Sequence, residues 1–398
     1  MSASTISGIV RSGCAVWLGL VLAVPAEAVT RYNIIELPSL YGRATRANGL
    51  NNLGQVVGQS EYNVDDYKDR PVVWQNGQVT QLPVPEWGYD FNRSGIAFDI
   101  NDSGVAAGWA TFGWGIGHAV TWTNGTLTDL GTIAGKGSSA SAINNAGQVV
   151  GSSNFDPNPP SQYDNRVHAF LWSQGTMTDL GTLGGTNSIA SDINEAGQVV
   201  GWADLPPMPG YARPIRSFFW ENGTMRLLSG LPDSNGGAYA INDRGQVVGV
   251  STGFGGDWRG HAFLWENGAA IDLSSLLPYG PIASEARAIN NLGQVAGFAA
   301  LPNLAGSAAF LWDGGSGYNL NELTNFPSGT SWVLRSAVAI NDVGQIVARD
   351  DWTGQVFLLT PVPEPATLML IVVCGGSVLR AARRRQHVLR MRSNFKDL

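Results

Sequence analysis

The chain of 398 residues has only two cysteines, and both lie near its ends. Cys14 belongs to an apolar N-terminal run and Cys374 to an apolar C-terminal run, so the body, residues 29–360, contains none. This absence excludes disulfide bonds, a cysteine nucleophile and thiolate-bound zinc from the body. Small exported domains often need disulfides because their cores are small, so a body without them requires a large and regular core.

Charge is also scarce, since only 14% of the residues are charged. Eight of the 24 basic residues and three of the 31 acidic residues lie in the end segments, which leaves the body with a net charge of −12. Binding to nucleic acid depends on Lys and Arg that neutralise phosphates, so nucleic acid is excluded as a partner. Little charge combined with 51 glycines and 14 tryptophans favours short strands joined by glycine turns over disorder or long surface helices.

What the sequence does contain is a repeat. The segment Ile-Asn-x-x-Gly-Gln-Val-Val-Gly and its variants recur seven times, with their asparagines at Asn51, Asn101, Asn144, Asn194, Asn242, Asn290 and Asn341. Each copy leads to a segment like His-Ala-Phe-Leu-Trp, and in the first six copies a turn such as Asn-Gly and a short segment that ends in an aliphatic residue follow, as at 320–323 in the sixth copy. Four short strands in about 48 residues match one blade of a β-propeller.

The last copy ends after its third strand, and residues 32–37 resemble a fourth strand with no unit before it. If this segment pairs with the last unit, the ring closes and no free edge remains. We therefore predict an all-β fold, a seven-bladed β-propeller of four-stranded antiparallel blades closed by the N-terminal strand, followed by a short apolar C-terminal helix. The alternative is an open solenoid. A solenoid needs atypical capping repeats, and it would not require the N-terminus to supply the last strand.

The N-terminus has the pattern of an export signal. Arg11 precedes an apolar run, 14–24, and Ala26 and Ala28 have the spacing of a signal peptidase site. We predict that residues 1–28 are a signal peptide. The alternative is a membrane anchor, for which the run is short.

The strand His168-Ala169-Phe170, repeated at 261–263, resembles the HAF-repeat extracellular proteins. The resemblance covers about residues 41–360, because the asparagine segment accompanies the motif in register. It implies an exported bacterial protein and no established activity. Ser217, Ala308 and Gln355 stand where the histidine would be.

The C-terminus resembles the PEP-CTERM sorting signal of Gram-negative bacteria that make exopolysaccharide. Its motif residues are Pro363, Glu364, Pro365, Arg383, Arg384 and Arg385, with an apolar run at 366–379 between them. The resemblance implies sorting by an exosortase over 361–385, with transient inner-membrane anchoring through a transmembrane helix. The arginines hold 386–398 in the cytoplasm as a tail. The alternative is an ordinary tail anchor.

The residues that could do chemistry follow the repeat instead of breaking it. Three of the four histidines, His118, His168 and His261, open equivalent strands, and Asp129, Asp179 and Asp272 also occupy equivalent positions. Residues repeated at one position favour a local hydrogen bond over catalysis. We therefore assign no catalytic, cofactor-binding or metal-binding residues and predict that the protein is not an enzyme.

Loops between the second and third strands are the expected place for ligand contacts. Calcium is a weak candidate ligand of the acidic loop with Asp65, Asp66 and Asp69, which lacks the spacing of a calcium-wrapping loop. The sequence thus favours a surface or extracellular-matrix protein that presents loops to exopolysaccharide or matrix proteins. The alternatives are a carbohydrate-active enzyme (glycosidase or lyase), if Asp65, Asp156 or Asp204 cluster at the channel, and a matrix filler without a specific ligand.

Overall fold

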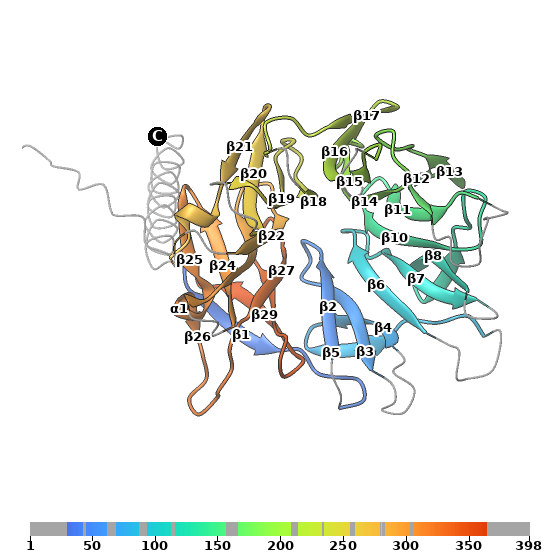
Figure 1. Ribbon diagram of the computed structural model, residues 1–398. Helices are drawn as coiled ribbons and strands as arrows, with labels where there is room; N and C mark the ends of the chain where they lie inside the picture. Colours follow the sequence, from blue (N-terminus) through green and yellow to red (C-terminus); the bar gives the residue numbers. More distant parts are fainter. Residues whose placement is uncertain are drawn as a thin grey trace, which may run out of the picture. The chain divides into compact units, whose positions relative to one another are not determined.

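The computed structural model describes residues 30–363 apart from 43–44, 62–68, 87–93, 113–115, 157–165, 208–213, 233–234, 255–258, 279, 281–282 and 303–305. Seven antiparallel sheets follow one another around a central axis (Figure 1). The predicted seven-bladed β-propeller is therefore confirmed. The predicted C-terminal helix lies outside the described residues.

Each blade runs outward from its first strand. The innermost strands are β2 (Thr45–Leu50), β6 (Gly95–Ile100), β10 (Ser138–Ile143), β14 (Ser188–Ile193), β18 (Gly236–Ile241), β22 (Ser284–Ile289) and β27 (Ser336–Ile340). The second strands are β3 (Val56–Glu61), β7 (Ala106–Phe112), β11 (Val149–Asn154), β15 (Val199–Asp204), β19 (Val247–Ser251), β23 (Val295–Ala300) and β28 (Ile346–Asp350).

In the first six blades the third and fourth strands form the hairpin predicted from the Asn-Gly turns. The third strands are β4 (Asp69–Gln75), β8 (Ile116–Thr123), β12 (Val167–Ser173), β16 (Ile215–Glu221), β20 (His261–Glu266), β24 (Ser307–Asp313) and β29 (Gln355–Pro361). The fourth are β5 (Gln78–Gln81), β9 (Thr126–Asp129), β13 (Thr176–Asp179), β17 (Thr224–Leu227), β21 (Ala269–Asp272), β25 (Ser316–Asn319) and β1 (Tyr32–Glu36). Both turn residues have positive φ, for example 49° at Asn124 and 77° at Gly125, as a type I′ turn requires.

The N-terminal strand closes the ring as predicted. β1 pairs antiparallel with β29 from Tyr32 opposite Pro361 to Glu36 opposite Phe357. Beyond this pair, the Val362 N–H donates to the Arg31 carbonyl at 2.8 Å. The chain therefore enters and leaves the propeller at the same pair of strands.

Two details differ from the prediction. The last sheet has five strands, because the two-residue β26 (Thr324–Asn325) pairs parallel with β1 outside the blade. Residues 320–323 form the short helix α1 (Leu320–Leu323) instead of a fourth strand, because β25 already fills that place and the Asn319 side chain caps the helix through the Asn321 N–H. The other short helix is the 3-10 helix η3 (Ser274–Leu276).

The core is divided among the gaps between blades, where seven clusters of buried apolar side chains lie. The two valines of a second strand pack against different neighbouring blades. Val149 packs against the preceding blade and Val150 against the following blade. A sheet covered on both faces needs apolar residues at successive positions, which explains the Val-Val pair. No blade buries its own core, so the blades stabilise one another.

The third strand supplies the largest core side chains, but the aromatic residue that is fully buried differs between blades. In five blades the phenylalanine is fully buried, as Phe170, Phe218, Phe263, Phe310 and Phe357. In the first two blades valine takes that position, and Trp74 and Trp122 are fully buried instead. Trp172 is only partly buried. The blades thus exchange one large aromatic side chain for another at similar volume.

Candidate functional site

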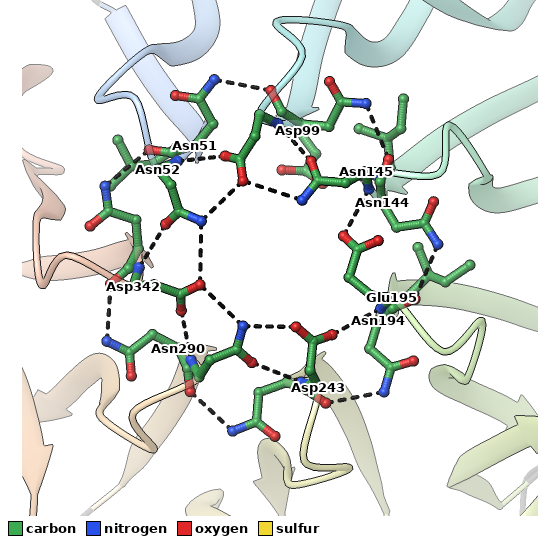
Figure 2. A pocket seen from close by; sticks show the side chains of 18 of the residues that line it. Asn51, Asn52, Asp99, Asn144, Asn145, Asn194, Glu195, Asp243, Asn290 and Asp342 are labelled. Carbon is green, nitrogen blue, oxygen red and sulfur yellow. Dashed lines mark hydrogen bonds between the residues drawn. The ribbon is translucent and has the colours of Figure 1, made fainter.

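The candidate site is the end of the central channel where the seven innermost strands finish. A polar cavity of about 380 Å³ lies there, lined by the Ile-Asn turns of six blades and by Leu50-Asn51 of the first (Figure 2). The same sequence segment lines it seven times, so its chemistry depends on the hydrogen bonds between the turns of neighbouring blades.

The seven asparagines of the repeat form a closed asparagine ring. Nδ2 of each donates to the main-chain oxygen of the asparagine in the next blade at 2.9–3.1 Å, and Asn341 closes the circle onto Asn51. Each side-chain oxygen accepts main-chain N–H groups of its own turn, as Asn242 does from Arg244 and Gln246. All seven are at most 6% exposed. The asparagine therefore folds its own turn and joins it to the next blade.

The residues that follow these asparagines form a second ring, the acid–amide ring, of Asn52, Asp102, Asn145, Glu195, Asp243, Asn291 and Asp342. The main-chain N–H of each donates to a side-chain oxygen of the next member at 2.8–2.9 Å, and Asp342 closes onto Asn52. Figure 2 shows both rings around the open centre.

Acids and amides alternate around this second ring. Asn52 and Asn291 each donate to the carboxylates on both sides, as Asn291 Nδ2 does to Asp243 at 2.8 Å and to Asp342 at 3.1 Å, and Asn145 Nδ2 donates to Asp102 at 3.2 Å. Because seven is odd, one pair of neighbours must break the alternation, and here it is Glu195 and Asp243. The amides keep the other carboxylates apart, which lowers the repulsion among four negative charges at one mouth.

Two further acids, Asp99 and Asp192, stand two residues before the ring asparagines of their strands. Asp192 accepts the N–H groups of Ile193 and, in the next blade, Ile241, each at 2.8 Å. Burial, and then the charge of Asp99, raises the pKa of Asp192 to about 8. Burial likewise raises the pKa of Asp99. Asp99 lines the cavity and Asp192 does not, so the carboxyl group that is uncharged at neutral pH lies beside the mouth, behind Ile193 and Asn194 of the lining.

The raised pKa gives folding a pH dependence. The pKa of an unfolded Asp is about 3.9, so between that value and about 8 the folded protein keeps a proton that the unfolded chain has lost. The free energy of unfolding therefore falls as pH rises through this window. Asp192→Ala introduces the residue that Ala142, Ala240, Ala288 and Ala339 place there in other blades. We expect this variant to gain stability relative to the wild type steadily from about pH 4 to pH 8. Parallel curves of unfolding free energy against pH, measured with urea, would contradict this.

The repeated histidines pair with the repeated aspartates through Nδ1. The distances to Oδ2 are 2.9 Å for His118 and Asp129, 2.8 Å for His168 and Asp179, and 3.0 Å for His261 and Asp272. Each imidazole also stacks on a phenylalanine that lies at or just after the end of the second strand, namely Phe112, Phe155 or Phe254. The other oxygen of each aspartate accepts a main-chain N–H two residues on. The pair holds the fourth strand to the third.

Asp179 shows the opposite pH behaviour to Asp192. Burial alone would raise its pKa, but hydrogen bonds from His168 and Gly181 and the nearby imidazole outweigh burial and lower the pKa. Its contribution to stability is therefore present above the unfolded pKa of about 3.9 and is lost as pH falls through the lower folded value. We expect Asp179→Asn to cost about 0.5–1 kcal/mol at neutral pH, with the difference disappearing in acid. A difference in urea unfolding that stays constant down to pH 2 would refute the assignment.

The acids proposed for a rival catalytic site do not meet in the described structure. In the third blade, Asp156 pairs with Arg166 at 2.7 Å. In the fourth blade, Asp204 accepts a hydrogen bond from Asn187 at 2.8 Å. Neither lines the central cavity. Asp65 and Asp66 lie outside the described residues, as do Glu364, Pro365 and the arginines of the sorting motif, whereas Pro363 ends the described chain.

Among the described residues, no three His, Cys, Asp or Glu side chains lie close enough together to hold a metal ion. No described helix is long and apolar enough to span a bilayer, and the apolar run 366–379 lies beyond the described region.

Sequence reasoning identified the repeat but missed both rings. One signal was present: the residue after each repeat asparagine is always Asn, Asp or Glu. Its meaning depends on closure, because each of these side chains reaches only the turn of the next blade.

The fold and this channel define the chain as a seven-bladed β-propeller. No family model matches it, and no curated protein does. Similar solved structures include the acylaminoacyl peptidase of Pyrococcus horikoshii, at 13% identity and a TM-score of 0.45 over 82% of this chain and 53% of that one. A puromycin-hydrolyzing peptidase of Mycobacterium tuberculosis has 12% identity and a TM-score of 0.44 over 83% and 56% of the two chains. This chain thus spans about half the length of these proteins.

Proposed function

We propose that the protein is an exported, non-catalytic surface or extracellular-matrix protein whose propeller presents its loops to polysaccharide or protein partners. Signal peptidase removes residues 1–28. The C-terminal segment then anchors the protein transiently in the inner membrane until an exosortase sorts it to the surface or the matrix.

The support is the way the propeller employs its polar side chains. The asparagine ring, the acid–amide ring and the three His–Asp pairs all recur from blade to blade, and their hydrogen bonds join strands and blades. A catalytic site brings several different functional side chains together around one reacting atom. Residues already engaged at equivalent positions in several blades fit a scaffold better.

A carbohydrate-active enzyme is the second candidate, and Asp192 is the observation that favours it. Glycosidases use a carboxylic acid of raised pKa as the general acid, and Asp192 has a pKa of about 8, with the carboxylates of the acid–amide ring at the neighbouring cavity. Release of reducing ends from polysaccharides, lost in Asp192→Ala, would favour this enzyme over the scaffold.

Binding is tested with protein isolated from producing cells, on a glycan array and by pull-down from matrix material. We expect at least one polysaccharide or matrix protein to be retained. Failure in both assays would contradict the binding role.

Sorting is tested separately, by replacing Pro363, Glu364 and Pro365 with alanine. We expect the altered protein to accumulate in the inner membrane, as followed by cell fractionation and immunoblotting. The matched control replaces the exposed residues Asn33 and Ile35. An unchanged distribution of the motif variant would contradict exosortase sorting.

A further inference from the structure

A second cavity, of about 260 Å³, gathers positive charge in this acidic protein. Its lining includes Arg46, Arg287, Arg349, Ser307, Ser336 and Asp351, and we call it the arginine pocket. Arg46 and Ser336 stand five residues before ring asparagines on β2 and β27. Five residues of strand span about 17 Å, so the pocket lies toward the end of the inner strands opposite the two rings.

The three guanidinium groups lie close enough to affect one another. Burial lowers the pKa of Arg349, and the charges of Arg287 and Arg46 lower it further against the opposing effect of Asp351. Like charges assembled in one cavity repel, and an anion among them would remove the repulsion.

Two of the arginines are positioned by their surroundings. Arg287 lies over the rings of Phe298 and Tyr239, at 5.3 and 5.9 Å from their centroids, and pairs with Glu285 at 2.8 Å. Arg349 Nε is buried and lies 3.2 Å from Asp351 Oδ1, but at an angle that makes no hydrogen bond. Its N–H group therefore has no acceptor within the described residues.

Among the described residues, Arg46 is the one arginine of the pocket that forms no ion pair. Its side chain is exposed, and no carboxylate of the described chain lies within the 4.0 Å of an ion pair. Glu285 pairs with Arg287 and Asp351 pairs with Arg349, whereas Asp69 acts on Arg46 only at longer range, so Arg46 keeps a positive charge without an ion pair among the described residues. A single carboxylate of a ligand matches this charge.

An exposed tryptophan stands at the rim. Trp352 follows Asp351 in the chain, and its ring lies against Gly306, next to Ser307 of the pocket wall. Arg335 covers one face of the ring at 3.2 Å from the centroid, yet 71% of the residue is exposed. The negative face of an indole attracts the C–H bonds of a pyranose ring, so this tryptophan suits stacking on a sugar.

We propose that the arginine pocket binds the carboxylate of a uronic acid residue in an acidic polysaccharide, with Arg46 and Arg349 on the carboxylate and Trp352 against the sugar or its neighbour. This inference rests on the proposed polysaccharide-binding function and names its ligand class and its place.

The test measures binding of the full-length protein to an oligogalacturonate by calorimetry, at low and moderate salt. We expect Arg46→Gln to weaken binding at least about tenfold, because a charge-assisted hydrogen bond is lost. Trp352→Ala should weaken it roughly fivefold, because the stacking surface is lost. The matched control is Arg226→Gln on β17, whose side chain is 60% exposed in another blade. This control should bind like the wild type.

The ligand has its own control, the methyl-esterified oligogalacturonate, which keeps the sugars and lacks the charge. Equal binding of the ester, or unchanged binding by both pocket variants while the glycan still binds, would overturn the pocket assignment and leave the proposed function standing. Equal competition by inorganic phosphate or polyglutamate would overturn the uronate as ligand. Absence of binding to every polysaccharide on the array would overturn the proposed function as well.

Discussion

Ile34→Asp opens the ring and lowers the free energy of unfolding by roughly 4 kcal/mol or more, because it places an unpaired carboxylate in the core. Ile34 is 8% exposed and belongs to the cluster between the sixth and seventh blades. It lies opposite Leu359 on β29, in the pairing that closes the propeller. Release of β1 would leave the main-chain groups of β29 without partners, and such an edge recruits other chains. We therefore expect the variant to form dimers or larger aggregates.

Ile35→Asp is the matched control for this experiment. The two residues are neighbours on β1, but Ile35 points outward and is 50% exposed. We expect the control to change stability by no more than about 0.5 kcal/mol. Urea unfolding and size-exclusion chromatography with light scattering compare the two variants. Equal behaviour of both would mean that β1 does not close the ring in solution.

Asn242→Ala is the second large effect, a loss of roughly 3–4 kcal/mol in the free energy of unfolding. The side chain donates to Gln246 Oε1 and to the carbonyl of Asn290 in the next blade, at 2.8 and 3.0 Å. Its oxygen accepts the N–H groups of Arg244 and Gln246 at 3.1 and 3.0 Å. The alanine variant leaves these buried groups without partners, which is more costly than losing an exposed hydrogen bond.

Asn242→Asp separates the two roles of this side chain. The carboxylate can still accept both N–H groups of the turn, but it cannot donate to the next blade. We expect it to be nearly as unstable as the alanine variant, because an acceptor then faces the Asn290 carbonyl. The control is Asn33→Ala, because Asn33 is exposed and accepts a hydrogen bond of 3.3 Å from Asn325 Nδ2. We expect this variant to have the same free energy of unfolding as the wild type. A loss below about 1 kcal/mol for Asn242→Ala would show that the asparagine ring contributes little to stability.

Much of the fold could be predicted from the sequence because each blade is specified locally. The Asn-Gly turn needs positive φ at two residues, and Asn124 and Gly125 adopt it. The unmatched segment 32–37 predicted the closing strand, since a third strand without a partner leaves a free edge. Residues 320–323 were predicted wrongly, because the pattern of the fourth strand does not show where it ends.

The sequence by itself determined the number of blades, the order of strands within them and the identity of the residues at each repeated position. Those properties follow from short-range patterns of turns and apolar alternation. Only the tertiary structure decided which strand faces the channel and how neighbouring turns join into two rings. It also brought Arg46, Arg287 and Arg349, from three blades, into one cavity. Contacts between blades join residues about 50 positions or more apart, and one repeat contains no information about the angle at which the next one packs.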